Sequence, residues 1–148
     1  MNDLEDLYKE IVLDHYRNPR NKGELPVPPA TRTEGFNPLC GDELTLFLDV
    51  RDGVIADIKI TGHGCSIFQS SASMMSIAVK GKDLATAHAV IASFKRMMTV
   101  SGSEEDPEPL DLRAMGEMAA LQGVVKFPAR IKCATLSWYT LLQALDEA

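Results

Sequence analysis

Two runs of alternating residues, joined by a short turn, constrain the fold of this chain more than any other feature. An aliphatic residue stands at every second position over residues 44–50, and the alternation returns over residues 54–60. A period of two is typical of a strand that buries one face. Because Asp52-Gly53 can form a tight turn between the two runs, the segment predicts a β-hairpin.

Helical periodicity dominates most of the remaining chain, with apolar residues three and four positions apart. The predicted helices cover residues 4–17, 66–81, 83–98, 112–123 and 131–145. Ser66 and Gln69 predict a capping box for the second of these helices, and Asp83 predicts the cap of the third. We expect His15 to lie on an ordinary amphipathic face of the first helix.

The segment between the first helix and the hairpin contains five prolines over residues 19–38, which exclude a long helix. We interpret it as extended, with a short strand over residues 30–34. Residues 101–109 combine like charges with glycine and proline and predict an exposed loop. Strands followed by helices indicate an α+β fold, with a small, mainly antiparallel sheet and helices packed on one face. A length of 148 residues predicts a single domain, 1–148.

Composition excludes several classes of function. Fifteen basic and twenty-one acidic residues give a net charge of −6, which disfavours binding to nucleic acid. No apolar run approaches the roughly 20 residues needed to cross a bilayer, so we expect no membrane insertion. The acidic first residues differ from a secretory signal and favour the cytoplasm. In that reducing compartment, free or metal-bound thiols are expected rather than disulfides.

The three cysteines, Cys40, Cys65 and Cys133, are the candidate chemical groups. With 24 and 67 residues between them they cannot form a local zinc finger, so joint chemistry requires the fold to gather them. Asp42 adds a carboxylate, and three thiolates with one carboxylate would complete the four-coordinate shell of zinc. Cys65 and Cys133 are predicted at helix starts, where the helix dipole stabilises a thiolate. The alternative is that these cysteines are small buried apolar residues.

Four motifs together carry a family resemblance that covers nearly the whole chain. They read LYKEIVLDHYRNPRN at 7–21, CGD at 40–42, GHGCS at 62–66 and FPARIKCATLSW at 127–138. In this combination the chain resembles the U-type iron–sulfur assembly proteins. Lys132 stands where the IscU scaffold branch of that family has a histidine, and residues 101–123 resemble an insertion of the SufU branch. Both features favour the SufU branch.

The resemblance to the SufU branch implies a tightly held Zn²⁺ with four ligands and two kinds of partner. The implied ligands are Cys40, Asp42, Cys65 and Cys133. The implied partners are a SufS-like cysteine desulfurase that depends on pyridoxal phosphate, and downstream iron–sulfur assembly proteins. Cys40 would receive sulfur from the persulfide of the desulfurase after a histidine of that partner replaces it on zinc.

Three residues near these ligands have less defined roles. Arg130 would steady the released thiolate or Asp42 by its charge, and the alternative is a solvated surface arginine. Lys132 is a poor zinc ligand when protonated, so we expect it to face solvent. His63 lies two positions before Cys65, but with four ligands already available we expect an exposed loop histidine.

The preferred functional hypothesis is a zinc-dependent sulfur acceptor for iron–sulfur cluster assembly, which acts as a sulfurtransferase together with the desulfurase. A second hypothesis is a scaffold on which a transient iron–sulfur cluster is built by the same cysteines. A third is a binding module in which zinc is purely structural. Metal content and the behaviour of a Cys40→Ala variant would separate the three.

Overall fold

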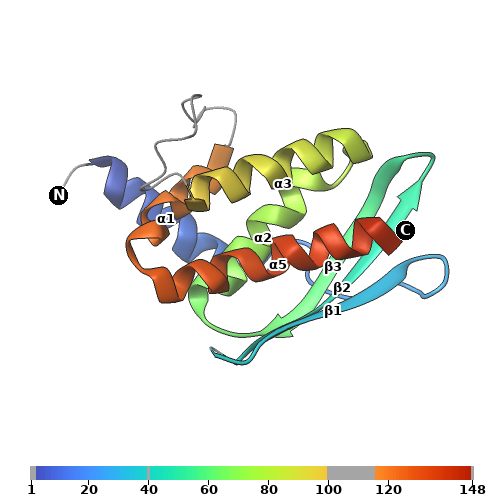
Figure 1. Ribbon diagram of the computed structural model, residues 1–148, viewed down its shortest axis with the longest axis horizontal. Helices are drawn as coiled ribbons and strands as arrows, with labels where there is room; N and C mark the ends of the chain where they lie inside the picture. The colour runs from blue at the N-terminus through green and yellow to red at the C-terminus, as the bar shows by residue number, and fades with distance from the viewer. Residues whose placement is uncertain (1–2, 40, 100–115, 148) are drawn as a thin grey trace.

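The structure, a computed structural model, describes residues 3–39, 41–99 and 116–147. Figure 1 shows three strands forming one sheet, with the helices gathered on one of its faces. The predicted α+β architecture is therefore confirmed. In chain order the elements are α1 (Asp3–Arg17), β1 (Thr31–Asn37), β2 (Asp42–Arg51), β3 (Val54–His63), α2 (Ser66–Val79), α3 (Leu84–Thr99), the 3₁₀ helix η1 (Gly116–Lys126) and α5 (Pro128–Glu147).

The sheet is antiparallel with strand order β1-β2-β3, and the predicted hairpin is its β2–β3 half. Asp52 and Gly53 both have positive φ, 53° and 74°, as a two-residue turn matched to the twist of the strands requires. The strand predicted over residues 30–34 is longer than expected, because pairing continues until Asn37 lies opposite Asp42. The last pair of the β1–β2 ladder, Asn37 and Asp42, is therefore separated in sequence only by residues 38–41, which include Cys40.

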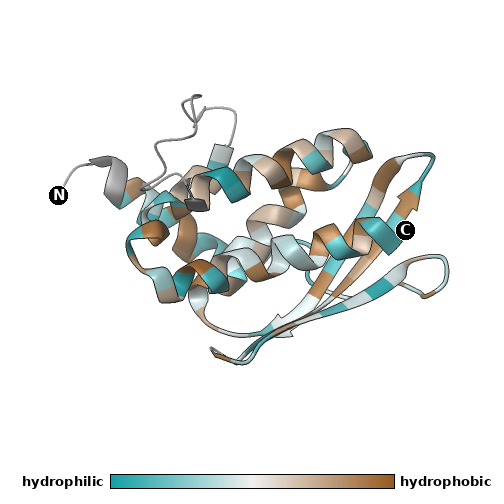
Figure 2. Ribbon diagram, in the orientation of Figure 1, coloured by the Kyte–Doolittle hydropathy of each residue, from teal (hydrophilic) through white to brown (hydrophobic). Residues whose placement is uncertain are grey.

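The hydrophobic core lies between the inner face of the sheet and the helices. Figure 2 shows apolar residues in the strands and in the helices that enclose it. Trp138 of α5 and Phe94 of α3 are fully buried and stack with ring centroids 4.2 Å apart. The indole nitrogen of Trp138 donates to the Ser71 hydroxyl of α2 at 2.9 Å. These contacts join three helices through one aromatic pair, which suits a well-packed interior.

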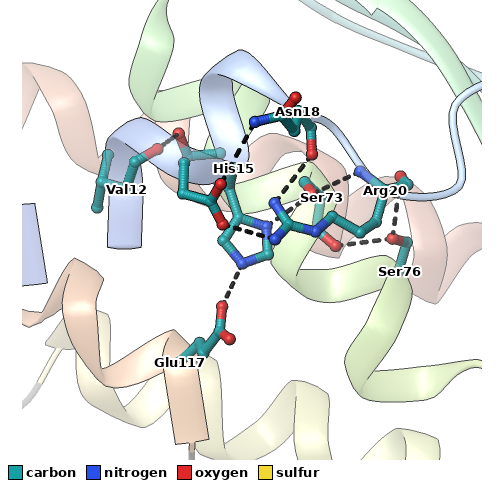
Figure 3. A network of polar contacts seen from close by, with 9 residues as sticks. Val12, His15, Asn18, Arg20, Ser73, Ser76 and Glu117 are labelled. Atoms are coloured by element: carbon teal, nitrogen blue, oxygen red, sulfur yellow. Dashed lines mark hydrogen bonds and ion pairs between the residues drawn. The ribbon is translucent and has the colours of Figure 1, made fainter. Parts of the chain in front are cut away.

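Helix α1 is attached to the rest of the fold by a buried polar network (Figure 3). His15 is fully buried, so its predicted place on an ordinary amphipathic face was wrong. Its Nδ1 lies 2.7 Å from the Ser73 hydroxyl of α2, and its Nε2 contacts the Glu117 carboxylate of η1. The same hydroxyl of Ser73 accepts a hydrogen bond from the backbone of Arg20 at 2.9 Å. A histidine in this position satisfies both ring nitrogens and therefore tolerates burial.

Two helix starts differ from their predicted positions. The predicted capping box was wrong, because Cys65 rather than Ser66 is the N-cap of α2, and the side-chain amide of Gln69 donates to the Gly64 carbonyl. Helix α5 begins at Pro128, three residues earlier than expected, since proline at the first helical position has no amide hydrogen to leave unpaired. Cys133 consequently lies in the second turn of α5, and its predicted place at a helix start was wrong.

The segment before α5 forms η1, which continues to Lys126 and does not end near residue 123 as predicted. The first residues of that predicted helix, 112–115, and the predicted loop 101–109 lie outside the described residues. Among the helices that the structure describes, none combines the length and apolar character needed to cross a bilayer.

Candidate metal centre

Three of the predicted ligands come together where β3 leads into α2, close to the beginning of β2 and the first turns of α5. One ligand atom each from Asp42, Cys65 and Cys133 lies within 4.8 Å of the others. These residues are 23 and 68 positions apart in sequence, so only the tertiary fold gathers them. The group could bind a metal ion.

Asp42, the first residue of β2, is held by the backbone of the α2 start. Its side chain is fully buried, and its Oδ1 accepts a hydrogen bond from the Cys65 amide at 3.0 Å. Its Oδ2 is buried and has no hydrogen-bond partner in the part of the chain that the structure describes. A buried carboxylate oxygen without a donor is strongly unfavourable unless a cation or another donor reaches it.

Gly64 makes the close contact between the Asp42 carboxylate and the Cys65 amide possible. A Cβ atom at position 64 would stand 2.4 Å from Asp42 Oδ1 and 2.7 Å from the Phe68 ring, which is closer than any side chain permits. The glycine therefore allows the carboxylate to reach the Cys65 amide. The residue before Cys65 was not predicted as part of the site, although the Gly-His-Gly sequence preceding the cysteine was the available signal.

Cys65 is half-buried and serves as the N-cap of α2. Its Sγ accepts a hydrogen bond from the Phe68 amide with a distance of 3.5 Å. The sulfur thereby satisfies one of the backbone amides that a helix start leaves without an intrahelical partner. Of the two cysteines predicted at helix starts, this one has that position.

Cys133 is fully buried in the second turn of α5, and its Sγ lies 3.9 Å from the Ala129 carbonyl oxygen. Arg130, one turn earlier, is exposed but reaches the sulfur atoms. Its pKa is raised above the usual arginine value, first by a hydrogen bond to the Cys133 sulfur and then by the negative charge of Cys65 and Cys133. The guanidinium group therefore supplies the positive charge that the dipole of the helix start does not supply at Cys133.

The remaining predicted residues lie outside this group. Cys40 is outside the described residues, so its side chain is not placed. Lys132 is exposed, as expected. His63 is exposed as expected, at 72%, and its Nε2 pairs with Glu43 at 3.1 Å, although it ends a strand and is not in a loop.

The chemistry of the three gathered donors fits Zn²⁺. Two thiolate sulfurs and one carboxylate oxygen are ligands that zinc accepts in a tetrahedral shell, with bonds of about 2.0–2.3 Å. Ligand atoms on such a shell stand about 3.5–4 Å apart, and the 4.8 Å limit that encloses the present donors is near this spacing. The orphaned Oδ2 of Asp42 is the acceptor that a cation would satisfy.

Comparison with known proteins agrees with this geometry. Residues 7–134 match the model of the NifU-like N terminal domain family, which is most of the chain. The chain belongs to the NifU-like N-terminal domain family. The resemblance noted in the sequence is thereby confirmed.

Two curated relatives cover nearly the full length of this family member. The zinc-dependent sulfurtransferase SufU of Bacillus subtilis is 48% identical over 138 residues, 93% of this chain and 88% of that protein. The iron–sulfur cluster assembly scaffold protein IscU of Streptococcus pyogenes is 38% identical over 145 residues, 98% of this chain and 86% of that protein.

A crystal structure from the same family supports the fold. FiSufU of Fervidobacterium islandicum AW-1, a candidate iron–sulfur cluster assembly scaffold for the SUF system, superposes with a TM-score of 0.82. It is 30% identical and covers 95% of this chain and 98% of its own. The sheet and the helices on its face are thus shared with a protein named for scaffolding.

Proposed function

We propose that this protein is a zinc-dependent sulfur acceptor for iron–sulfur cluster assembly, which receives sulfur on Cys40 from the persulfide of a cysteine desulfurase. The observation that carries the proposal is the group of Asp42, Cys65 and Cys133, in which Asp42 has a buried carboxylate oxygen without a partner among the described residues. The 48% identity to a zinc-dependent sulfurtransferase over nearly the whole chain supports the same function. A reducing compartment, the cytoplasm, suits this chemistry because it keeps thiols free.

The residues of the site divide into fixed and exchangeable ligands. Asp42 is fixed by the Cys65 amide, Cys65 by its place at the helix start, and Cys133 by complete burial. Cys40 stands beside Gly41, whose φ of +72° marks a sharp turn before β2. Bound zinc would keep the ligating thiols deprotonated and hold them near one another. We assign Cys40 as the ligand that leaves this set when the partner docks.

The sulfur transfer itself is a thiol–disulfide type exchange. The Cys40 thiolate attacks the outer sulfur of the partner's cysteine persulfide. A new sulfur–sulfur bond forms on Cys40 while the sulfur–sulfur bond of the partner breaks, and the partner cysteine leaves as a thiolate. No external oxidant or reductant is needed, because the outer sulfur carries its oxidation state with it.

Arg130 would assist this exchange by charge. It is exposed, yet it hydrogen-bonds the Cys133 sulfur and lies within the field of Cys65. Because its side chain is long and exposed, its guanidinium group can pair with the thiolate of a ligand that leaves the site. We therefore assign it to stabilising the open form of the site, with Lys132 and His63 left in solvent.

A scaffold function is the second candidate, because IscU relatives match almost the whole chain at 38% and 34% identity. Iron–sulfur clusters also use cysteine thiolates as ligands. A purely structural zinc is the third candidate, and it predicts that metal removal unfolds the domain. The higher identity to the sulfurtransferase and the exposed Lys132 favour the first candidate.

The deciding experiment combines zinc analysis with sulfur loading. Wild type, Cys40→Ala and Leu39→Ala are each incubated with desulfurase and cysteine, and desulfurase turnover and protein persulfide are measured. Leu39 is the matched control because it neighbours Cys40, is exposed and has no ligand atom. We expect Cys40→Ala to lose both signals while it retains its fold, and Leu39→Ala to keep both. Normal turnover and persulfide formation with Cys40→Ala would refute the proposal, and a stable cluster on the isolated wild type would favour the scaffold.

A further inference from the structure

Three buried side-chain atoms lack a hydrogen-bond partner in the described part of the chain: Asn37 Nδ2, Asp42 Oδ2 and Ser137 Oγ. Folded proteins pair nearly all such atoms, so each exception calls for an explanation. The Asp42 atom is explained by the metal centre. The positions of the other two in the fold place them beside that same centre.

Asn37 is the register partner of Asp42 at the closed end of the β1–β2 ladder. Directly opposed residues of an antiparallel pair project from the same face, so the Asn37 amide lies on the side of the sheet that carries the metal ligand. Its Oδ1 already accepts a hydrogen bond from the Leu39 amide at 3.2 Å. This bond fixes the orientation of the carboxamide and leaves Nδ2 as a buried donor, in a residue only 7% exposed.

Ser137 lies one helical turn after Cys133, on the same face of α5. Further along that face Thr140 packs on β1, since a Cβ at Gly35 would stand 2.2 Å from its hydroxyl oxygen. From Thr140 back to Ser137 the helix rises ~4.5 Å, and from Gly35 to Asn37 the strand advances ~6.6 Å.

The two segments run in opposite directions, because Thr33 at the other end of β1 bonds Glu147 at the end of α5. Moving along β1 toward Asn37 therefore means moving back along α5 from Thr140 toward Cys133. Ser137 consequently lies over the end of β1 where Asn37 is found, next to the metal ligands.

The unpaired state of Ser137 is specific to this place on α5. Two threonines of the same helix donate to the carbonyl four residues earlier, Thr135 to Ile131 and Thr140 to Leu136, each at 2.9 Å. The same bond would be available to a serine in any helix interior. Ser137 does not make it, although its side chain is fully buried.

We propose that Asn37 Nδ2 and Ser137 Oγ form a pair of hydrogen-bond donors that binds the anionic sulfur delivered to the metal centre. Once a cation takes Asp42 Oδ2, both groups still need an acceptor, and the acceptor that the reaction brings is a thiolate or persulfide sulfur. Hydrogen bonds from neutral donors to a charged acceptor are stronger than those between neutral groups. This inference rests on the proposed sulfur transfer and names the groups that would hold its product.

The test measures how long the protein keeps its persulfide. Zinc-loaded wild type, Asn37→Asp, Ser137→Ala and Thr135→Val are loaded by desulfurase and cysteine, and the persulfide half-life is followed after addition of dithiothreitol. Asn37→Asp retains the acceptor for Leu39 but replaces the donor, and Thr135→Val removes a hydroxyl of α5 that is already paired. We expect half-lives shortened about tenfold in Asn37→Asp and Ser137→Ala, and a half-life within about twofold of wild type in the control.

A measurement of thermal unfolding without metal separates this role from a structural one. Ser137→Ala removes an unpaired buried hydroxyl, so its metal-free midpoint should equal or exceed that of wild type. Wild-type half-lives in both Asn37→Asp and Ser137→Ala would overturn the inference while leaving the proposed function intact. If wild type acquires no persulfide, the proposed function itself fails, and the donor pair fails with it.

Discussion

The two halves of α5 differ in what they do with buried atoms. The later half presents Trp138, Leu141 and Leu145 to the interior, and the indole is both stacked on a ring and hydrogen-bonded. The earlier half buries the Cys133 sulfur and reaches the unpaired hydroxyl of Ser137 at the boundary between the two. One helix thus supplies a closed apolar core at one end and an incompletely satisfied polar site at the other.

Stability and chemistry are therefore separated along α5. Apolar burial in the later half stabilises the fold without any ligand. Buried polar atoms near the earlier half weaken the metal-free protein and gain their partners only from a cation or a sulfur anion. A substitution in the later half should therefore leave metal binding nearly unchanged. A substitution in the earlier half should leave the stability of the metal-free protein nearly unchanged.

The largest expected effect is on stability in the later half. Trp138→Ala removes a fully buried indole and its stacking with Phe94, and should lower the free energy of unfolding by about 3–5 kcal/mol. Urea titration of the metal-free protein checks this. Under conditions where the variant is folded, zinc stoichiometry should remain that of wild type, and loss of zinc from the folded variant would contradict the separation.

A change in stability of similar size, but of opposite sign, should come from zinc binding at the earlier half of α5. Free zinc at a thousandfold excess over its dissociation constant should raise the free energy of unfolding by about 4 kcal/mol. Cys65→Ser, a change at a half-buried ligand, should remove most of this gain. Calorimetry with and without zinc measures it, and an equal zinc-induced shift in the variant would exclude Cys65 as a ligand.

A smaller effect should follow from crowding the carboxylate. Gly64→Ala places a methyl group 2.4 Å from Asp42 Oδ1, so it should destabilise the fold by about 1–3 kcal/mol and weaken zinc binding as well. Gly123→Ala is the matched control, because no described atom beyond its chain neighbours and its own helix backbone lies within 4 Å of the added methyl group. The control should unfold within about 0.5 kcal/mol of wild type, and equal losses in both variants would argue against the carboxylate contact.

The smallest effect should arise outside α5, at the start of α3. Asp83 accepts a hydrogen bond from the Thr86 amide at 2.7 Å, and the bonds to Thr86 lower the pKa of Asp83 below its usual 3.8. A lowered folded pKa means that its contribution exists above the unfolded value and disappears as the pH falls through the folded one. Asp83→Ala should lower the melting temperature at pH 7 by a few degrees. That difference should shrink below about pH 3.8, and a constant difference would show that the carboxylate charge plays no part.

Local patterns predicted the fold well, because strand alternation and helical spacing record which face of each element is buried. The hairpin at Asp52-Gly53 and the helices on one face of the sheet are examples. Helix starts were harder. Pro128 moved the beginning of α5 back by three residues, and a cysteine replaced serine as the cap of α2. Both outcomes depend on which backbone amides need partners, and alternation does not encode that.

The candidate site could be predicted only in part from the sequence. Asp42 and the cysteines carry ligand atoms, so their residue types alone made them candidate ligands. Asn37 and Ser137 are polar residues of ordinary kinds, and what distinguishes them is a missing partner. A missing hydrogen bond is a property of three-dimensional packing, since it depends on contacts between segments that are far apart along the chain.

The cap of α2 has a consequence for how the metal could be followed. The Phe68 amide donates to the Cys65 sulfur, which is also a proposed metal ligand, so one sulfur atom serves both the helix end and the cation. Withdrawal of sulfur electron density toward a metal should loosen that amide and leave the rest of the helix unchanged. The chemical shift and the hydrogen-exchange rate of the Phe68 amide would then report whether the site holds a metal.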